Sequence, residues 1–125
     1  MGSKPLRVFP VEDMPQMRNS LTALLSADGA CEIVGTAESE QQAVRWSLDH
    51  EAGFDVAVVD LLLQEGSGFA AMAHLVKYQP GKVVVLSGYV TPAVKERCLS
   101  LGALAAFGKE DTAECIDFVR GLAPL

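Results

Sequence analysis

The segment Phe54–Gly68, FDVAVVDLLLQEGSG, carries the strongest indication of the fold of this chain. Its first part is almost continuously apolar and rich in valine, which is typical of a strand covered on both faces in a parallel sheet. Asp60 falls where this strand should end, and a Gly-Ser-Gly turn follows the next few residues. In an open α/β sheet, ligands bind beyond the carboxyl ends of the strands. A lone carboxylate at that edge is therefore the first candidate for chemistry.

Segments of strand and helix character alternate along the rest of the chain. Strands are expected at 6–11, 31–36, 54–60, 82–86 and 104–107, and helices at 14–27, 39–53, 68–78, from 91 onward, and at 111–123. Five such repeats predict an α/β fold with a five-stranded parallel sheet of order 2-1-3-4-5, flavodoxin-like and doubly wound, with five helices on its two faces. We expect one domain over residues 1–125, with its core at about 6–123.

Local signals refine the expected helices and strands. Ser39 followed by Gln42, and Asp111 followed by Glu114, match the capping-box pattern of helix starts. The helix at 39–53 is expected to turn Ala43, Val44 and Leu48 inward, with Trp46 as a further candidate. His50 and His74 are interpreted as surface residues. Pro10 predicts a local irregularity in the first strand, because proline cannot donate to a ladder.

Composition narrows the class of protein. The net charge is −6 and the sequence holds no basic cluster, which argues against binding of nucleic acid by this chain. No apolar run approaches the roughly 18 residues of a membrane span, and no secretory signal is visible. The three cysteines are widely spaced and form no CxxC motif, which indicates buried thiols in a reducing compartment. These features predict a cytoplasmic protein that does not enter the membrane.

Polar side chains follow four of the expected strands: Glu12 and Asp13, Asp60, Ser87, and Lys109. In the order 2-1-3-4-5 the first and third strands are neighbours, so Asp13 and Asp60 should face each other with Glu12 beside them. Three close carboxylates repel one another unless a cation compensates their charge. A set of oxygen ligands suits Mg²⁺, which the sequence therefore predicts as the cofactor.

Such a site suits the acceptance of a phosphoryl group. A carboxylate can act as the nucleophile and form an acyl phosphate, while Mg²⁺ and the ammonium of Lys109 neutralise the charge. Simpler interpretations exist for each residue alone: Asp13 as a helix cap, Asp60 in a turn, Ser87 at a strand end and Lys109 on the surface. Their joint occurrence at the same ends of four strands favours the site.

These residues resemble the receiver domains of bacterial two-component response regulators. The motifs VEDMP, VVDLLLQEGSGF, VVVLSG and AAFGKED occur in the order typical of that family, and the similarity runs from about Leu6 to Ala123. Gly68, eight residues after Asp60, also stands where the family usually places a glycine. Each motif alone is weak, but together they identify the chain as a member of this family.

The resemblance implies a phosphorylation switch. Asp60 would accept the phosphoryl group from a sensor histidine kinase or a phosphotransfer protein, and Ser87 and Lys109 would hold the phosphoryl oxygens. The implied Mg²⁺ ligands are Glu12 largely through water, Asp13, Asp60 and the carbonyl of Leu62. The switched surface would comprise the fourth helix, the fifth strand and the fifth helix, through which a homodimer could form. The switch would regulate a partner or an attached output domain, and the residues suit a stand-alone regulator equally well.

Three positions depart from the pattern of the family. Gln64 replaces a frequent proline, Glu110 replaces a frequent cis proline, and Ala106 replaces the Tyr or Phe that moves inward on activation. A cis bond before a residue other than proline costs about 3 kcal/mol, so we expect a trans bond before Glu110. Ala106 predicts that output depends on main-chain shifts of the loop 87–91 or on Tyr89.

Three other functions are alternatives to the switch. A phosphate-independent interaction or dimerisation module would keep the fold without needing the intact acids. A phosphohydrolase that works through an aspartyl phosphate needs a second acid two residues after the nucleophile, where this chain has Leu62. A flavin carrier needs a phosphate-binding loop where Glu12 and Asp13 stand, and two carboxylates would repel the phosphate of that cofactor.

Bulky Leu62 and Tyr89 beside the site predict slow loss of the phosphoryl group to water.

Overall fold

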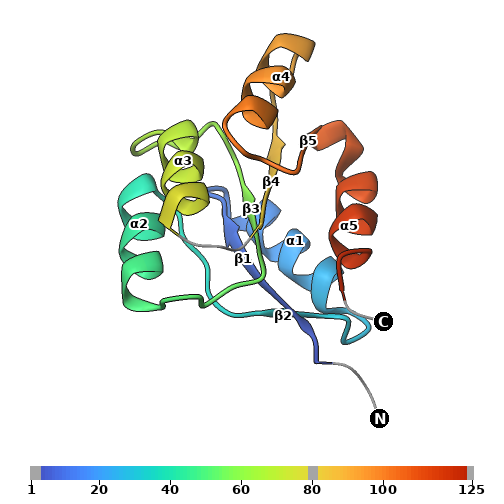
Figure 1. The fold of residues 1–125 in the computed structure, drawn as a ribbon. Helices are drawn as coiled ribbons and strands as arrows, with labels where there is room; N and C mark the ends of the chain where they lie inside the picture. The colour runs from blue at the N-terminus through green and yellow to red at the C-terminus, as the bar shows by residue number, and fades with distance from the viewer. Residues whose placement is uncertain (1–3, 79–81, 124–125) are drawn as a thin grey trace.

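The computed structural model describes residues 4–78 and 82–123. Its strands form one parallel sheet in the order β2-β1-β3-β4-β5 (Figure 1), which confirms the predicted doubly wound fold. The strands are β1 (Leu6–Val11), β2 (Cys31–Ile33), β3 (Val56–Val59), β4 (Lys82–Ser87) and β5 (Ala105–Gly108). The helices are α1 (Pro15–Ser26), α2 (Glu40–Asp49), α3 (Gly68–Tyr78), α4 (Pro92–Ser100) and α5 (Thr112–Arg120), with a 3₁₀ turn, η1 (Lys109–Asp111), before α5.

The helices cover both faces of the sheet and divide the core into two halves. Helices α1 and α5 lie on one face of the sheet, and α2, α3 and α4 lie on the other (Figure 1). Their buried side chains belong to the two separate halves of the core. Because successive side chains of a strand point to opposite faces, Val56 and Val58 of β3 join the first half, whereas Ala57 and Val59 join the second. Burial on both faces explains why this strand is a continuous apolar run.

Pro10 lies within a continuous β1, and the expected irregularity is in the neighbouring strand. The even-numbered residues of β1 face β2, as the bonds from Val34 N to Val8 O and from Ala37 N to Pro10 O show. Proline has no N–H to offer on that side. Regular pairing accordingly stops at Ile33 and resumes only as an isolated bridge at Ala37, so β2 is shorter than the predicted 31–36.

Helix starts follow the predicted caps at α2 but not at α5. The Ser39 hydroxyl accepts from the backbone N–H of Gln42 at 3.1 Å, as the capping-box pattern predicts. The Asp111–Glu114 box was a wrong prediction, because the Asp111 side chain makes no cap bond. The Thr112 hydroxyl instead donates to Lys109 O at 2.6 Å, across the turn η1 that separates β5 from α5.

The buried face of α2 differs from the prediction. Ala43 and Ser47, which are one helical turn apart, are buried, whereas Leu48 is 67% exposed and Val44 only partly buried. The Ser47 hydroxyl lies 2.9 Å from His74 Nε2 of α3, so His74 is a half-buried helix-packing residue and was wrongly placed on the surface. The rotation of α2 about its axis is therefore set by its packing against α3, and the hydrophobic pattern of the sequence alone predicted the wrong buried face.

The three cysteines are buried and free, as predicted. Burial raises the pKa of Cys115 to about 12. Among the described residues, no helix is both long enough and apolar enough to cross a membrane.

Candidate functional site

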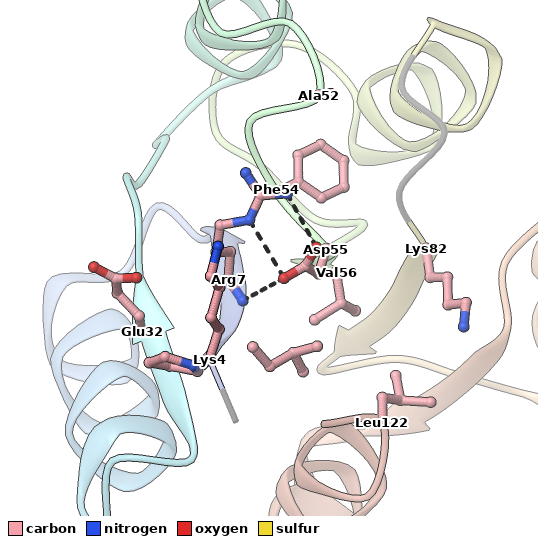
Figure 2. A pocket seen from close by; sticks show the side chains of 11 residues that line it. Lys4, Arg7, Glu32, Ala52, Phe54, Asp55, Val56, Lys82 and Leu122 are labelled. Atoms are coloured by element: carbon pink, nitrogen blue, oxygen red, sulfur yellow. Dashed lines mark hydrogen bonds and ion pairs between the residues drawn. The ribbon is translucent and has the colours of Figure 1, made fainter. Parts of the chain in front are cut away.

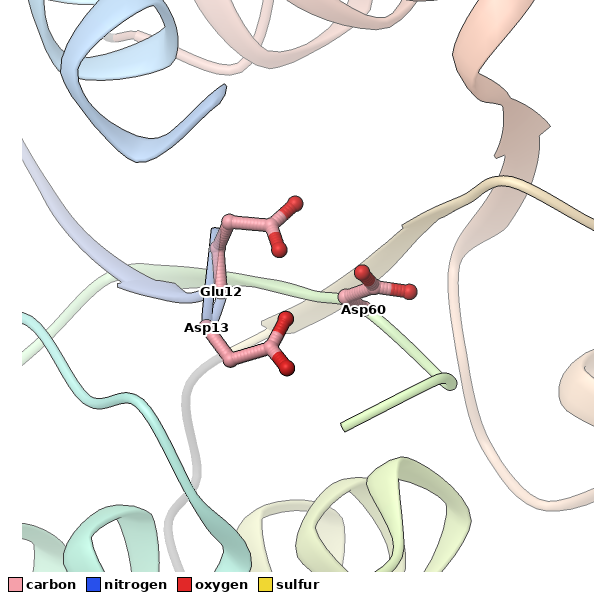
Figure 3. A group of neighbouring side chains, drawn as sticks. All are labelled: Glu12, Asp13 and Asp60. Atoms are coloured by element: carbon pink, nitrogen blue, oxygen red, sulfur yellow. The ribbon is translucent and has the colours of Figure 1, made fainter. Parts of the chain in front are cut away.

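Three carboxylates meet at the carboxyl edge of the sheet (Figure 3). β1 and β3 pair with Val11 opposite Val59, so the residues that follow them leave the sheet side by side. One oxygen from each of Glu12, Asp13 and Asp60 lies within 4.8 Å of the others. The predicted juxtaposition of the first and third strands is therefore present in the structure.

The carboxylate of Asp60 is buried and surrounded by donors. Asp60 is only 3% exposed. The hydroxyl of Ser87, at the end of β4, donates to Oδ1 at 2.8 Å, and the backbone N–H of Leu62 donates to the same oxygen at 3.0 Å. The ammonium of Lys109 donates to Oδ2 at 3.0 Å. A buried anion held by a hydroxyl, an amide and an ammonium is well satisfied, as burial of a charge requires.

Lys109 joins two of the acids. Its ammonium also lies 2.8 Å from Glu12 Oε1. Burial alone would lower the pKa of Lys109, but the hydrogen bonds to Glu12 and Asp60 outweigh it and the pKa is raised. Burial raises the pKa of Glu12, and the bonds from Lys109 and from the Met14 N–H offset this only in part. The peptide bond that follows Lys109 is trans, as expected.

Asp13 does not cap α1. The residue at the helix N-cap is Met14, which supplies no side-chain cap, and the Met14 N–H donates to Glu12 Oε2 at 3.1 Å. Asp13 Oδ2 instead accepts from the backbone N–H of Gln64 at 2.9 Å, across 51 residues of sequence. Asp13 therefore belongs to the site and holds the loop that follows β3.

Arg18 is a residue of the site that the sequence reasoning missed. From α1, its guanidinium donates to the backbone carbonyl of Glu12 at 2.9 Å and pairs with Glu38 Oε1 at 3.2 Å. Arg18 thus fixes the end of β1 and the segment that leads into α2. In the sequence, Arg18 is the one arginine of the helix that follows Glu12 and Asp13. The hydrophobic periodicity of that helix gave no reason to assign Arg18 to the site.

Gly68 sets the spacing between the acid and the helix that follows. A Cβ placed on Gly68 would lie 2.1 Å from the carbonyl oxygen of Asp60. The start of α3 therefore packs directly on the end of β3, and only glycine permits that approach. The loop between them, residues 61–67, is compact and runs along the edge of the acidic site.

The donor set fits a hard divalent cation. Three carboxylates face one ammonium, which leaves two negative charges uncompensated at the edge of the sheet. Carboxylate oxygens are the ligands that Mg²⁺ prefers, and nitrogen or sulfur ligands are absent from the described cluster. Its charge and its chemistry both suit such an ion.

A separate cavity lies at the amino-terminal edge of the sheet (Figure 2). Its volume is about 790 Å³, and its main charged contact joins Arg7 to Asp55, with Nη2 to Oδ1 at 3.1 Å. The backbone N–H of Arg7 also donates to Asp55 Oδ2 at 2.8 Å. These two charges satisfy each other and tie β1 to the residue before β3, so the candidate site remains the acidic edge.

The response regulator receiver domain is the family whose model matches this sequence, over residues 8–119. The chain belongs to that family. The matched residues include every residue of the acidic site and all of the strands and helices except Leu6, Arg7 and Arg120.

The receiver is similar to segments of larger proteins. It is 32% identical over 120 residues to protein-glutamate methylesterase/protein-glutamine glutaminase 3 of Myxococcus xanthus, which covers 94% of this chain and 33% of that relative. It is 31% identical over 105 residues to the corresponding enzyme 2 of Koribacter versatilis, covering 82% of this chain and 28% of that protein. The chain therefore spans about a third of the length of these relatives.

Solved receiver structures share the fold. The signal receiver domain of the response regulator NarL from Mycobacterium tuberculosis matches with a TM-score of 0.80 and 26% identity, covering 95% of this chain and 99% of that one. The response regulator domain of Thermotoga maritima CheB matches with a TM-score of 0.83 and 22% identity, covering 97% and 98%.

Proposed function

We propose that this receiver accepts a phosphoryl group on Asp60 and thereby switches its interactions. The observation that carries the proposal is the convergence of Ser87 and Lys109 on that carboxylate, at 2.8 and 3.0 Å. Glu12 shares the ammonium, but the Ser87 hydroxyl is directed at Asp60. Asp60 is thus the acid whose two oxygens already lie beside the hydroxyl and ammonium donors that a phosphoryl group needs.

The transfer requires that one anion attack another. A carboxylate oxygen of Asp60 forms a bond to phosphorus while the bond from phosphorus to the donor's imidazole nitrogen breaks, and that nitrogen keeps the electron pair. The ammonium of Lys109 and the hydroxyl of Ser87 then stabilise charge on the phosphoryl oxygens. These groups are held in place before the reaction, so little reorganisation is needed.

We further propose that the acidic cluster holds Mg²⁺. Its ligands would be Glu12, Asp13, Asp60 and the carbonyl of Leu62. When bound, Mg²⁺ supplies charge neutralisation for the incoming phosphoryl group. The support is the shared position of three carboxylates whose negative charge Lys109 only partly balances.

The phosphoryl donor would be a sensor histidine kinase or a phosphotransfer protein. The output would be a partner or an attached domain. Because the relatives are longer proteins named protein-glutamate methylesterases, we propose a methylesterase domain as one candidate for the attached domain. Sequencing the native gene beyond codon 125 tests this proposal directly, because an attached methylesterase needs a reading frame about three times as long. A stop codon at that point would exclude an attached domain that follows this segment and would favour a separate partner.

Two rival functions are less well supported. A phosphohydrolase would need an acid at position 62, but the structure has an exposed leucine there. A phosphate-independent interaction module would have no need for a satisfied Asp60 between Ser87 and Lys109. Ala106, which is buried in the core, is the feature that favours the second rival.

Intact-mass measurement tests the proposed acceptor. The chain is incubated with acetyl phosphate and Mg²⁺, and the wild type should gain the mass of one phosphoryl group. Asp60→Asn should gain none, whereas Asp117→Asn, which removes an exposed acid of α5, should be labelled like the wild type. Labelling of the Asp60→Asn variant would disprove the assignment. Absence of labelling in the wild type, with acetyl phosphate and with a histidine kinase alike, would favour the phosphate-independent module.

A further inference from the structure

The loop at residues 61–67 is held by three carboxylates through its backbone. Asp60 Oδ1 accepts from the N–H of Leu62 at 3.0 Å, and Asp13 Oδ2 accepts from the N–H of Gln64 at 2.9 Å. The third bond runs to another element: Glu40 Oε1, in the first turn of α2, accepts from the N–H of Ser67 at 2.8 Å. Two of these carboxylates belong to the acidic site and the third does not.

The contact between this loop and α2 is close on the backbone as well. The N–H of Glu40 donates to the carbonyl of Glu65 at 3.3 Å. Gly66 adopts φ +84°, and a Cβ on it would lie 2.5 Å from the Cβ of Glu40. The loop is therefore in direct contact with the start of α2, so a movement of the loop acts on the first turn of that helix through two hydrogen bonds and the packing of Gly66 on Glu40.

A second connection reaches the same end of α2 from β1. Arg18 links the carbonyl of Glu12 to the carboxylate of Glu38, two residues before the helix begins. The Glu38 N–H in turn donates to Gln42 Oε1 at 2.8 Å, within the first turn. The start of α2 is thus tied to both strands that carry the acids.

We propose that Glu40 is a positioning residue that couples the acidic site to α2, so that loading of the site with its ligands changes the environment of that helix. The proposal rests on the proposed function, because it takes Asp13 and Asp60 as the groups that are loaded. Both carboxylates use an oxygen to hold the loop, so any change in their position or charge alters those bonds. Coupling between two sites is reciprocal, and the loop with Glu40 is the physical connection.

Trp46 of α2 reports on such a change. It is the single tryptophan of the chain. Its ring stacks on Phe9 of β1 at 4.0 Å between centroids and on His50 at 4.4 Å. A displacement of α2 relative to β1 alters the first of these stacks and hence the fluorescence of Trp46.

The test uses the full chain with Mg²⁺ and beryllofluoride, an analogue of a phosphoryl group. Binding of beryllofluoride is followed by ¹⁹F NMR, the response of α2 by Trp46 fluorescence, and the loop by hydrogen exchange at the Ser67 amide. In the wild type, binding should change the fluorescence. In Glu40→Ala, binding should persist, the fluorescence change should be largely lost, and the Ser67 amide should exchange about tenfold faster, the factor expected for loss of a charge-assisted hydrogen bond.

Two variants control for charge and for folding. Glu40→Gln keeps an oxygen that can accept from Ser67, so it should retain the fluorescence change. Glu65→Gln removes a charge from the same loop but leaves its backbone carbonyl in place, and it should behave like the wild type. An unchanged response in a folded Glu40→Ala, or binding without any response in the wild type, would overturn the coupling alone. Failure of the wild type to bind beryllofluoride would overturn the proposed function together with it.

Discussion

Glu12 and Asp60 are two buried acids that depend on one ammonium. Lys109 Nζ lies 2.8 Å from the first and 3.0 Å from the second, and the surrounding protein excludes water from both. Burial raises the pKa of Glu12 even with this partner present. The negative charge of Glu12 is therefore unfavourable in the free protein. This arrangement is not the most stable one for the free protein, which agrees with the proposed role of this edge in binding a cation and a phosphoryl group.

Removal of Lys109 tests that balance. Lys109→Met should lower the free energy of unfolding by about 2–4 kcal/mol at neutral pH, because two buried carboxylates lose their counter-charge. The loss should shrink at mildly acidic pH, where Glu12, whose pKa is raised by burial, takes up a proton. Urea denaturation at both pH values measures it, with exposed Lys95→Met as the matched control. A loss that does not depend on pH would show that packing, and not charge, is the cause.

Leu62 and Tyr89, which stand two residues after Asp60 and Ser87, are expected to lie beside the proposed acceptor and to limit the access of water to it. Both side chains are exposed, at 60% and 66%, and neither can orient a water molecule as an acid would. We expect slow loss of the phosphoryl group from the wild type. Leu62→Glu should accelerate that loss by at least about tenfold, because it supplies a general base beside the site. Decay of the phosphorylated mass over time measures both; a wild-type lifetime of seconds would contradict the expectation.

At the scale of elements, the junction of β3 and α3 leaves no space at Gly68. The position that a Cβ would occupy is 2.1 Å from a backbone oxygen, which cannot rotate away. Gly68→Ala should destabilise the protein by about 1–3 kcal/mol, the usual range for overpacking. Gly88→Ala is the control, since a Cβ there meets nothing within 4 Å. Equal unfolding free energies for the two variants would show that the junction adapts.

The end of β5 lacks an inward aromatic side chain on the side of α4. Ala106 is buried there among the residues that α3 and α4 cover. Phe107 points to the opposite face, where its ring lies 5.7 Å from that of Phe118 of α5. Phe107 therefore does not replace the missing aromatic, and we expect communication between the site and this part of the sheet to use the backbone at 87–91 or Tyr89.

At the scale of the whole molecule, the alanine at position 106 bears on the surface formed by α4, β5 and α5. Leu99, Leu104 and Phe118 are exposed there, and we expect this surface to form a homodimer when the site is loaded. Analytical ultracentrifugation with and without beryllofluoride measures the dimerisation constant. Ala106→Tyr should leave the effect of beryllofluoride unchanged if the signal travels through the backbone; a much larger effect in that variant would show that an aromatic switch is needed. A monomer in both conditions would contradict the expected dimer.

Stability against acid depends partly on the opposite edge of the sheet. The hydrogen bond from Arg7 holds the pKa of Asp55 below its ordinary value of 3.8. A lowered pKa means that the pair stabilises the fold above that value and that this contribution is lost as the pH falls through the lower, folded-state pKa. Asp55→Asn should therefore be less stable than the wild type at neutral pH, with the difference closing in acid. A difference that stays constant down to acid pH would exclude the ion pair as its source.

The sequence by itself determined the architecture and indicated that Glu12, Asp13, Asp60, Ser87 and Lys109 lie at one edge of the sheet, although it did not indicate Arg18. Valine-rich runs separated by helical segments require a parallel sheet with two covered faces, and the polar residues after the strands at 6–11, 54–60 and 82–86 must then share one edge. This inference needs only the periodicity of side chains and the order of the strands, which are local and topological properties. Ser87 and Lys109 were found in the same way, and the structure brings both to Asp60.

Only the tertiary structure decided how those residues are held. Asp13 binds Gln64 across the sheet edge and does not cap its own helix, Arg18 joins Glu12 to Glu38, and Ser47 packs where Leu48 was expected. Each of these contacts joins segments that are distant in sequence or depends on how a helix is rotated against its neighbour. Neither pattern nor propensity encodes such pairings, because they arise only when packing brings the two surfaces together.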